Sequence, residues 1–433
     1  MLRLPSFFKY FLFAGFVVVS GFAGLKIYTG PVLHWLLVLF LLGLWGIVFH
    51  SQRECSATEH FSAPRKRIMF VSLPWILLTL SVFVAASAND WVGLHALPKY
   101  AALAFVLVGM MLYTPTNREV LVGLKALCLM ALAALILLWL ANAWNWLVFA
   151  PNRYGWIWAP PGVLWKAGIF LVPYFAWAIM TADERSGAQW FWLVLACLVA
   201  GADGSRTAAV ASFLIWLAVV GLAVARFGFN GRTGTKSALI GMIMLLAMGG
   251  LNPTSLNPLH ALYQSTLGAE VFLEEESILD AAEESLLEIP PPIREVGEDS
   301  ARLKMLKRGF EGSVENFPVG AGFGTTTIFV PEIEGQMVVH MTYLQVLSDL
   351  GILGLLGYLG VFLVPVYIAF RKIRKSADRW GEFDGYVLPL GIVGIYLFSG
   401  LFHPISNEIS EWAIVLVACA LLVKWFSSKP NTA

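Results

Sequence analysis

Long runs of apolar residues, separated by polar segments, make up most of the chain. A run such as VLHWLLVLFLLGLWGIVF is apolar at nearly every position, so it lacks the alternation of a β-strand or of a membrane barrel. A helix needs about 20 such residues to cross a hydrocarbon core of roughly 30 Å. The pattern therefore predicts an all-α polytopic membrane protein with about twelve transmembrane helices, at 10–25, 31–50, 68–88, 95–113, 120–142, 162–180, 189–204, 206–225, 237–250, 341–370, 386–403 and 411–426.

One polar segment is far longer than the others and lies between the ninth and tenth predicted helices. It divides the chain into an N-terminal membrane block, a large loop and a C-terminal membrane block, at 1–250, 251–340 and 341–433. Within the loop, residues 270–288 are rich in Glu and Leu and predict a helix, which IPPPIRE interrupts. DSARLKMLKRGFEGS predicts a second helix, which Asp299 or Ser300 can cap and Gly309 or Gly312 can end.

The distribution of charge orients these helices. Hydrophobic residues make up 58% of the 433 positions and charged residues 13%, and the net charge of +1 favours no nucleic-acid partner. Every even-numbered loop is basic, so the positive-inside rule places the even loops and both termini in the cytoplasm. The large loop is then on the opposite side. The main basic residues of the even loops are Arg65, Lys66, Arg67, Arg118, Arg185, Arg232, Lys236, Arg371, Lys372, Arg374 and Lys375.

Arg206, at the start of the eighth predicted helix, is the first candidate for chemistry. An arginine so close to hydrocarbon is costly unless it faces protein, water or an anion. Judged by position alone, a side chain at a helix end that extends to the membrane interface fits Arg206 as well as a functional arginine does. Because Ser205 is a plausible cap, the helix N-terminus and the guanidinium point to the same place, which favours a phosphate site.

The basic group Arg302, Lys304, Lys307 and Arg308 is the second candidate. Lys304 and Lys307 fit a solvated helix whose cations pair with the acidic residues Glu295, Glu298 and Asp299. The acidic stretch before this group has no paired histidines or compact Asp cluster, and the four cysteines fit core positions, so we expect no metal site.

His340, directly before the tenth predicted helix, is the third candidate. A lone histidine at a membrane interface is most often an amphipathic residue at headgroup level. The N-terminal end of the helix dipole favours the neutral imidazole, which is the form that a general base requires. Asp349 lies more than two turns deeper on the opposite side of that helix and is expected to orient a neighbouring helix. Glycines recur there at every third residue, which predicts close helix packing: Gly351, Gly354, Gly357 and Gly360.

The stretch from Arg302 to Gly360 resembles the signature region of the O-antigen ligase and polymerase superfamily. It has an arginine on a helix of the large loop, then NFPVGAGFGTT, then a histidine leading into TYLQVLSDLGILGLLGYLG, and the SRT motif at 205–207 adds to the match. The family also has a large periplasmic loop between two blocks of membrane helices. It commonly has Asn after the histidine, where this chain has Met341.

The resemblance implies an O-antigen ligase in the inner membrane of a Gram-negative bacterium, with its active site on the periplasmic side. The donor would be O-antigen on undecaprenyl diphosphate and the acceptor a sugar hydroxyl of the lipid A core oligosaccharide, with no cofactor or metal. Arg206 and Arg302 would hold the diphosphate, and His340 would activate or position the acceptor. Because the sequence offers no obvious nucleophile for a covalent intermediate, we predict direct displacement with inversion at the anomeric carbon.

Other functions fit the same sequence pattern. An O-antigen polymerase or a protein O-oligosaccharyltransferase differs only in the acceptor. A transporter of lipid-linked glycan is the non-enzymatic alternative, but its ionisable residues are expected near the bilayer midplane in two related halves. Here the ionisable candidates gather at one predicted surface of the membrane.

Overall fold

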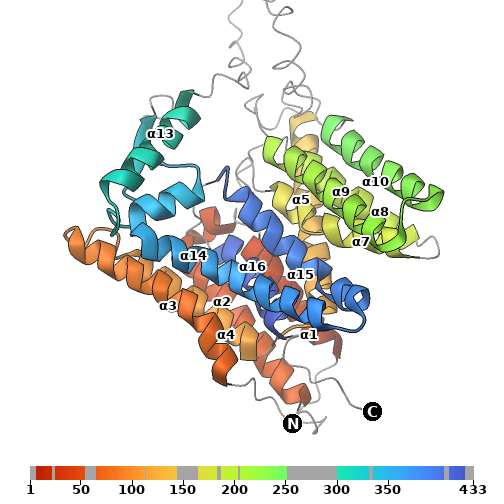
Figure 1. Cartoon of the computed structure of the whole chain (residues 1–433), viewed down its shortest axis with the longest axis horizontal. Coiled ribbons are helices and arrows are strands. Elements are labelled where there is room, and N and C mark those ends of the chain that lie inside the picture. Colours follow the sequence, from red (N-terminus) through yellow and green to blue (C-terminus); the bar gives the residue numbers. More distant parts are fainter. Residues whose placement is uncertain are drawn as a thin grey trace, which may run out of the picture. The chain divides into compact units, whose positions relative to one another are not determined.

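Seen here as a computed structural model, the protein is almost entirely helical in the residues that the structure describes (Figure 1). The structure describes residues 6–21, 25–53, 65–112, 114–143, 164–182, 187–202, 205–250, 300–330, 335–403 and 409–424. The helices are α1 (Ser6–Gly21), α2 (Leu25–Arg53), α3 (Arg65–Ala88), α4 (Ala96–Leu112), α5 (Asn117–Ala143), α6 (Leu164–Ile169), α7 (Val172–Thr181), α8 (Gly187–Ala202), α9 (Arg206–Phe227), α10 (Gly231–Gly250), α13 (Ser300–Glu315), α14 (Thr342–Lys375), α15 (Arg379–Ser399) and α16 (Ile409–Lys424). Two short strands, β1 (Thr327–Val330) and β2 (Gly335–Val338), pair antiparallel.

Each predicted membrane span coincides with helix in the structure. The span predicted at 162–180 is two short helices, α6 and α7, because Pro173 at the start of α7 lacks an N–H and its ring clashes with a preceding carbonyl. Within the described ranges, six helices are long and apolar enough to cross a bilayer, and four more are shorter apolar helices. The chain is thus an all-α membrane protein, while the full count of twelve crossings stays a prediction.

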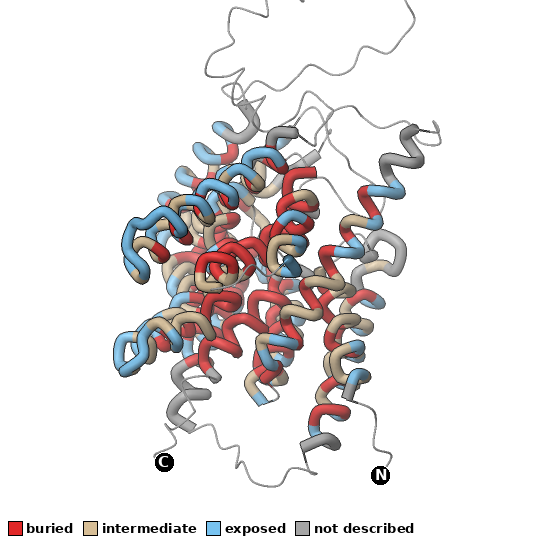
Figure 2. The backbone as a smooth tube through the Cα atoms, turned by 90° about the vertical axis from the view of Figure 1, so that its right-hand side faces the viewer, coloured by how far each residue is buried: buried red, intermediate tan, exposed pale blue. Residues whose placement is uncertain are grey.

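Large apolar side chains are exposed along the flanks of these helices. Phe40 on α2, Ile76 on α3 and Phe105 on α4 are all more than half exposed, and exposed and buried positions alternate around the helices (Figure 2). A soluble protein rarely exposes so much contiguous apolar surface. These flanks are suited to contact lipid.

The described helices belong to two compact units. Unit 1 comprises Met1–Gly21, Thr29–Leu127 and Ala301–Ala433, and unit 2 comprises Phe22–Tyr28 and Cys128–Ser300. Three cysteines, Cys128, Cys197 and Cys419, are buried and unbridged, as expected of core residues. The predicted division at 250 and 340 stays a prediction.

In unit 1, α3 and α14 lie side by side (Figure 1). A Cβ added at Gly357 would lie 2.5 Å from the backbone nitrogen of Leu78, and one at Gly360 would lie 2.7 Å from Cβ of Pro74. The predicted close packing along the glycine ridge is therefore confirmed at these positions. Small residues let the two backbones approach and gain van der Waals contact, which replaces the hydrophobic effect within a bilayer.

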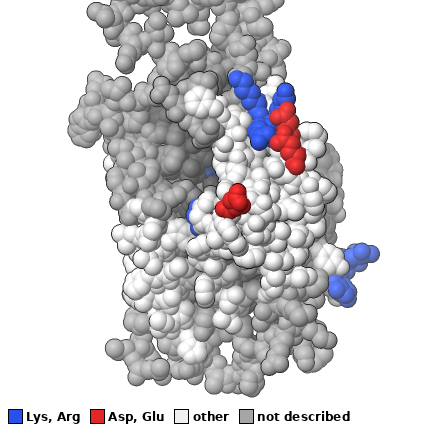
Figure 3. Space-filling view, turned by 90° about the vertical axis from the view of Figure 1, so that its left-hand side faces the viewer, with Lys and Arg blue, Asp and Glu red and all other residues white. Residues whose placement is uncertain are grey.

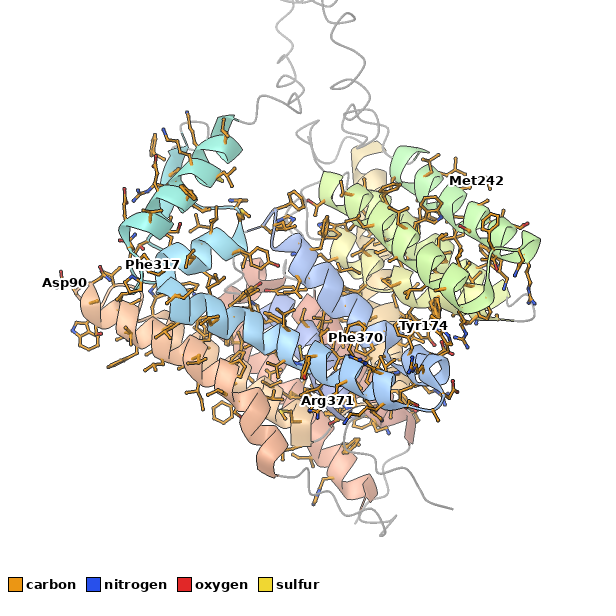
Figure 4. All side chains as sticks on the ribbon, in the orientation of Figure 1. Asp90, Tyr174, Met242, Phe317, Phe370 and Arg371 are labelled. Carbon is orange, nitrogen blue, oxygen red and sulfur yellow. The ribbon has the colours of Figure 1, made fainter. Side chains whose placement is uncertain are left out.

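The basic loops of unit 1 meet at one of its ends. Lys9 forms an ion pair with the fully buried Glu119 (3.2 Å), Asn117 donates to the carbonyl of Gly385 (2.7 Å), and α14 ends in Lys372, Arg374 and Lys375. The N-terminal segment and the fourth and tenth predicted loops thus share this end, as the predicted topology requires. At the other end, the turn after α3 bonds to residues 318–326. Both residues 318–326 and the turn after α15 bond to the first part of α14. Figure 4 shows Asp90 and Phe317 near that end and Phe370 and Arg371 toward the basic one.

The basic loops of unit 2 also lie together at one of its ends. Arg232 and Lys236, in the first turns of α10, donate to the Ala182 carbonyl at the end of α7 (2.9 and 2.7 Å). Cations at a helix C-terminus satisfy its orphan carbonyls and complement its dipole. The sixth and eighth predicted loops are therefore at one end of this unit.

Candidate functional site

The beginning of α14 is interrupted in a way that the sequence pattern did not predict. Gly351 has φ +66°, a left-handed conformation that favours glycine, and a Cβ there would overlap the carbonyl of Pro318. This break frees backbone groups of α14, which form hydrogen bonds with the segment 316–326. We call this segment the glycine loop. Ala321 N–H donates to the Ser348 carbonyl (3.0 Å), Gly322 N–H to the Asp349 carbonyl (2.9 Å) and Ile352 N–H to the Pro318 carbonyl (3.0 Å).

The side chain of Asp349 fixes the other half of this loop. It is 1% exposed and accepts from the N–H groups of Gly324 (2.9 Å) and Thr326 (3.0 Å), from the hydroxyl of Thr326 and, more weakly, from Gln345 (3.4 Å). Hydrogen bonds to a buried carboxyl group are among the stronger ones in a protein. The expectation that Asp349 orients a neighbouring helix was wrong, because Gly351 breaks α14 and Asp349 binds a loop instead.

A short chain of contacts connects this loop to His340. The Thr326 carbonyl accepts from the N–H of Val339 (3.2 Å), which is fully buried and packs with Met305 of α13. The next residue is His340, whose Nδ1 lies 2.8 Å from the Val338 carbonyl oxygen. A carbonyl oxygen only accepts, so Nδ1 carries the proton, and Nε2 is the basic nitrogen of the neutral ring.

The turn after α15 holds the same region from a second side. The N–H of Thr342 donates to the carbonyls of Gly400 (2.8 Å) and His403 (3.0 Å), and its hydroxyl donates to the His403 carbonyl (2.8 Å). The His403 carbonyl is thus bonded to Thr342, which lies two residues after His340 in the chain. The sequence did not single out His403, since nothing local distinguishes it.

The turn between α3 and α4, residues 89–95, supports the glycine loop from a third side. The side-chain amide of Asn89 donates to the Gly320 carbonyl (2.9 Å), and a Cβ at Gly322 would lie 2.6 Å from the Val92 carbonyl oxygen. Asp90 and Trp91 adopt positive φ, which is uncommon for residues other than glycine and concentrates at functional sites.

The helix α13 packs over the first part of α14 and carries Arg302 in its first turn. A Cβ at Gly309 would lie 2.9 Å from Val339, and one at Gly312 would meet Ser348. The second helix predicted in the large loop is thereby confirmed, but neither glycine ends it. They are its contact points with α14, and the helix runs on to Glu315. The side chain of Arg302, the cap candidate Asp299 and the helix predicted at 270–288 are outside the described residues.

The cations of α13 pair within their own helix. Lys307 lies 3.8 Å from Glu311, and Arg308 lies 3.0 Å from Glu315. The prediction named Glu295, Glu298 and Asp299 as partners, and these residues are outside the described ranges. In the part of the chain that the structure describes, no three His, Cys, Asp or Glu side chains gather as metal ligands.

Arg206 is the first residue of α9, as predicted. Ser205 caps this helix by accepting from the N–H of Ala208 (3.4 Å). The side chain of Arg206 is outside the described residues, and the residue belongs to unit 2, whereas Arg302 and His340 belong to unit 1. That the three side chains meet remains a prediction.

No protein-family model matches this chain, and no curated protein matches it significantly.

Proposed function

We propose that the protein is an O-antigen ligase, a membrane glycosyltransferase that moves a glycan from undecaprenyl diphosphate to a sugar hydroxyl of the lipid A core. The observation that carries the proposal is the setting of His340. Its imidazole is partly exposed, its Nδ1 is committed to the Val338 carbonyl, and it immediately precedes α14 at the end of unit 1 opposite the basic loops.

In this mechanism the acceptor hydroxyl attacks the anomeric carbon of the donor sugar. The O–H proton passes to Nε2 of His340, a carbon–oxygen bond forms at the anomeric centre, and the bond to the diphosphate oxygen breaks with its electron pair. Undecaprenyl diphosphate leaves as the anion. General-base assistance of this kind contributes roughly 10²- to 10⁴-fold to the rate. Direct attack inverts the anomeric configuration.

The leaving diphosphate needs positive charge where its own charge grows. Arg206 and Arg302 would supply it, together with backbone donors at the N-terminus of α9. The N-terminus of α14 is less suited to this task, because the first N–H of that helix is already bonded to the carbonyls of Gly400 and His403. Arginines that bind the leaving group more tightly as the bond breaks lower the barrier by several kcal/mol.

The donor also supplies the driving force, since its sugar is already linked to a good leaving group, and no nucleotide is required. The charge sorting in unit 1 supports an active site on the periplasmic face of the inner membrane, with the basic loops in the cytoplasm. Donor and acceptor lipids would then reach the site from the same leaflet.

Reconstitution of the purified protein tests this function. The protein in vesicles receives undecaprenyl diphosphate-linked O-antigen and lipid A core, with EDTA and without nucleotide, and the products are separated by size and lipid. Glycan attached to lipid A core is the expected product. Longer chains on undecaprenyl diphosphate would assign a polymerase, transfer to Ser or Thr of an added acceptor protein would assign a protein O-oligosaccharyltransferase, and donor moved across the bilayer but unconsumed would assign a transporter.

A further inference from the structure

The helix α13 carries a row of large apolar side chains that face away from the protein. Four of them, Leu303, Leu306, Phe310 and Val314, are between 47% and 69% exposed. Their spacing of three, four and four residues places them on one side of the helix. We call this row the apolar stripe. Phe317, two residues beyond the end of the helix, is exposed as well.

The stripe is additional to the face that α13 uses for folding. Met305, Gly309 and Gly312 are buried toward α14 and the hairpin, and the charged residues occupy a third sector of the helix. A helix on a soluble surface needs one apolar face toward the core and one polar face toward water. A second, exposed apolar face calls for a second apolar partner.

The surroundings of the stripe point to lipid as that partner. In Figure 1, α13 lies across the beginning of α14 rather than alongside it, as a helix at the surface of a bilayer does. Apolar side chains are also exposed on the α3–α4 turn. Trp91 and Val92 in the α3–α4 turn, which contacts the glycine loop, are about half exposed, and Trp91 stacks edge-on against Phe83 of α3. Tryptophan prefers the headgroup level of a membrane.

The charge on α13 fits the same partner. Figure 3 shows charged side chains gathered over α13 beside a broad uncharged surface. Lys304 and Lys307 are exposed, and the 3.8 Å pair of Lys307 with Glu311 is too open to water to neutralise it. Long lysine side chains can extend from such a position to anionic headgroups while their methylene groups remain in contact with apolar surface.

We propose that α13 is an interfacial helix whose apolar stripe inserts into the headgroup region of the bilayer on the side of His340, with Lys304 and Lys307 against anionic lipid headgroups. The proposal does not depend on the reaction that the protein catalyses. It places the first turn of α13, which carries Arg302, at the depth of lipid headgroups.

Site-directed fluorescence in vesicles tests the insertion. Cys55 is replaced, since the three described cysteines are buried, and single cysteines at Leu303 and Phe310 receive an environment-sensitive dye. Matched labels at Glu311, on the charged face, and at Phe105, on the lipid-exposed flank of α4, serve as controls. We expect the stripe labels to show blue-shifted emission and quenching by nitroxide lipids labelled near the headgroup, and the Glu311 label to be quenched by aqueous iodide. Stripe labels quenched mainly by iodide would overturn the proposal, and so would labels shielded from both quenchers, because another segment or a second copy would then cover the stripe.

Lipid composition tests the role of the lysines. Emission from the Phe310 label is compared in phosphatidylcholine vesicles with and without phosphatidylglycerol, for the parent and for a Lys304→Gln/Lys307→Gln variant. A larger blue shift with phosphatidylglycerol in the parent, lost in the variant, is the expected result. The same shift in both proteins would refute the contact with anionic headgroups.

Discussion

Removal of the Asp349 carboxyl group should release the glycine loop and, through it, His340. The substitution Asp349→Ala deletes the acceptor for the N–H of Gly324 and for both the N–H and the hydroxyl of Thr326. A buried donor left without an acceptor costs about 1–3 kcal/mol. Thr326 is buried, whereas Gly324 is partly exposed and can bond to water, so we expect a total cost of about 2–4 kcal/mol for opening the loop.

Hydrogen exchange measures this cost at the amides concerned. In local opening, every 1.4 kcal/mol is a tenfold change, so the amides of Thr326 and Val339 should exchange roughly 30- to 1,000-fold faster in Asp349→Ala than in the parent. Asp349→Asn keeps one carbonyl oxygen for Thr326, so its exchange rates should lie between those of the parent and those of Asp349→Ala. The matched control is Asp90→Asn, an exposed carboxylate in the α3–α4 turn, which should leave both amides unchanged.

Unchanged exchange at Thr326 and Val339 in Asp349→Ala would refute the idea that this carboxyl group holds the loop. Equal acceleration across all helices would instead show that Asp349 stabilises the whole membrane domain and has no special link to the loop. Transfer activity adds a second measurement. Because Val339 immediately precedes His340, the released loop should lower kcat more than it raises KM.

Three further results are expected. Gly351→Ala should destabilise the protein by about 2–4 kcal/mol, because a Cβ there overlaps the glycine loop and the backbone is left-handed. The control is Gly394→Ala on α15, where a Cβ meets nothing within 4 Å, and it should be neutral or slightly stabilising. Equal stabilities of the two variants in detergent unfolding would contradict this prediction. Glu119→Ala should cost about 3–5 kcal/mol, because it strands the Lys9 ammonium and the capping donors of α5, and an unchanged unfolding midpoint would refute the role of that pair. Alkaline phosphatase is active only in the periplasm, so it should be active when fused within residues 89–95 and inactive when fused at 376–378. The reverse pattern would show that the topology is opposite to the predicted one.

Much of this architecture could be predicted from local sequence. Apolar runs of about 20 residues have few alternatives to a membrane helix, so every predicted span coincides with helix. The placement of His340 before α14 and of Arg206 behind the cap Ser205 followed from the same runs and from capping chemistry. These features depend on residues within a few positions of each other.

The features that local sequence missed depend on pairs far apart in the chain. Gly351 looked like one more glycine in a packing ridge, and only its contact with Pro318 shows that it breaks the helix. Asp349 reaches back more than twenty residues to Thr326, which no periodicity reveals. The strands β1 and β2 are four residues each, too short to give a pattern. The meeting of Arg206, Arg302 and His340 is likewise a long-range matter that the sequence alone leaves as a prediction.

The rate of glycan transfer by His340→Ala, measured beside His50→Ala in the same vesicles, tests the central claim most directly. His50 is on α2 beside the basic second loop, so its loss controls for removing a histidine. We expect transfer to lipid A core to fall by roughly 10²- to 10⁴-fold in His340→Ala and to remain at the parent rate in His50→Ala. Equal transfer rates in the two variants, with both proteins folded, would contradict a base at His340 and with it the proposed mechanism.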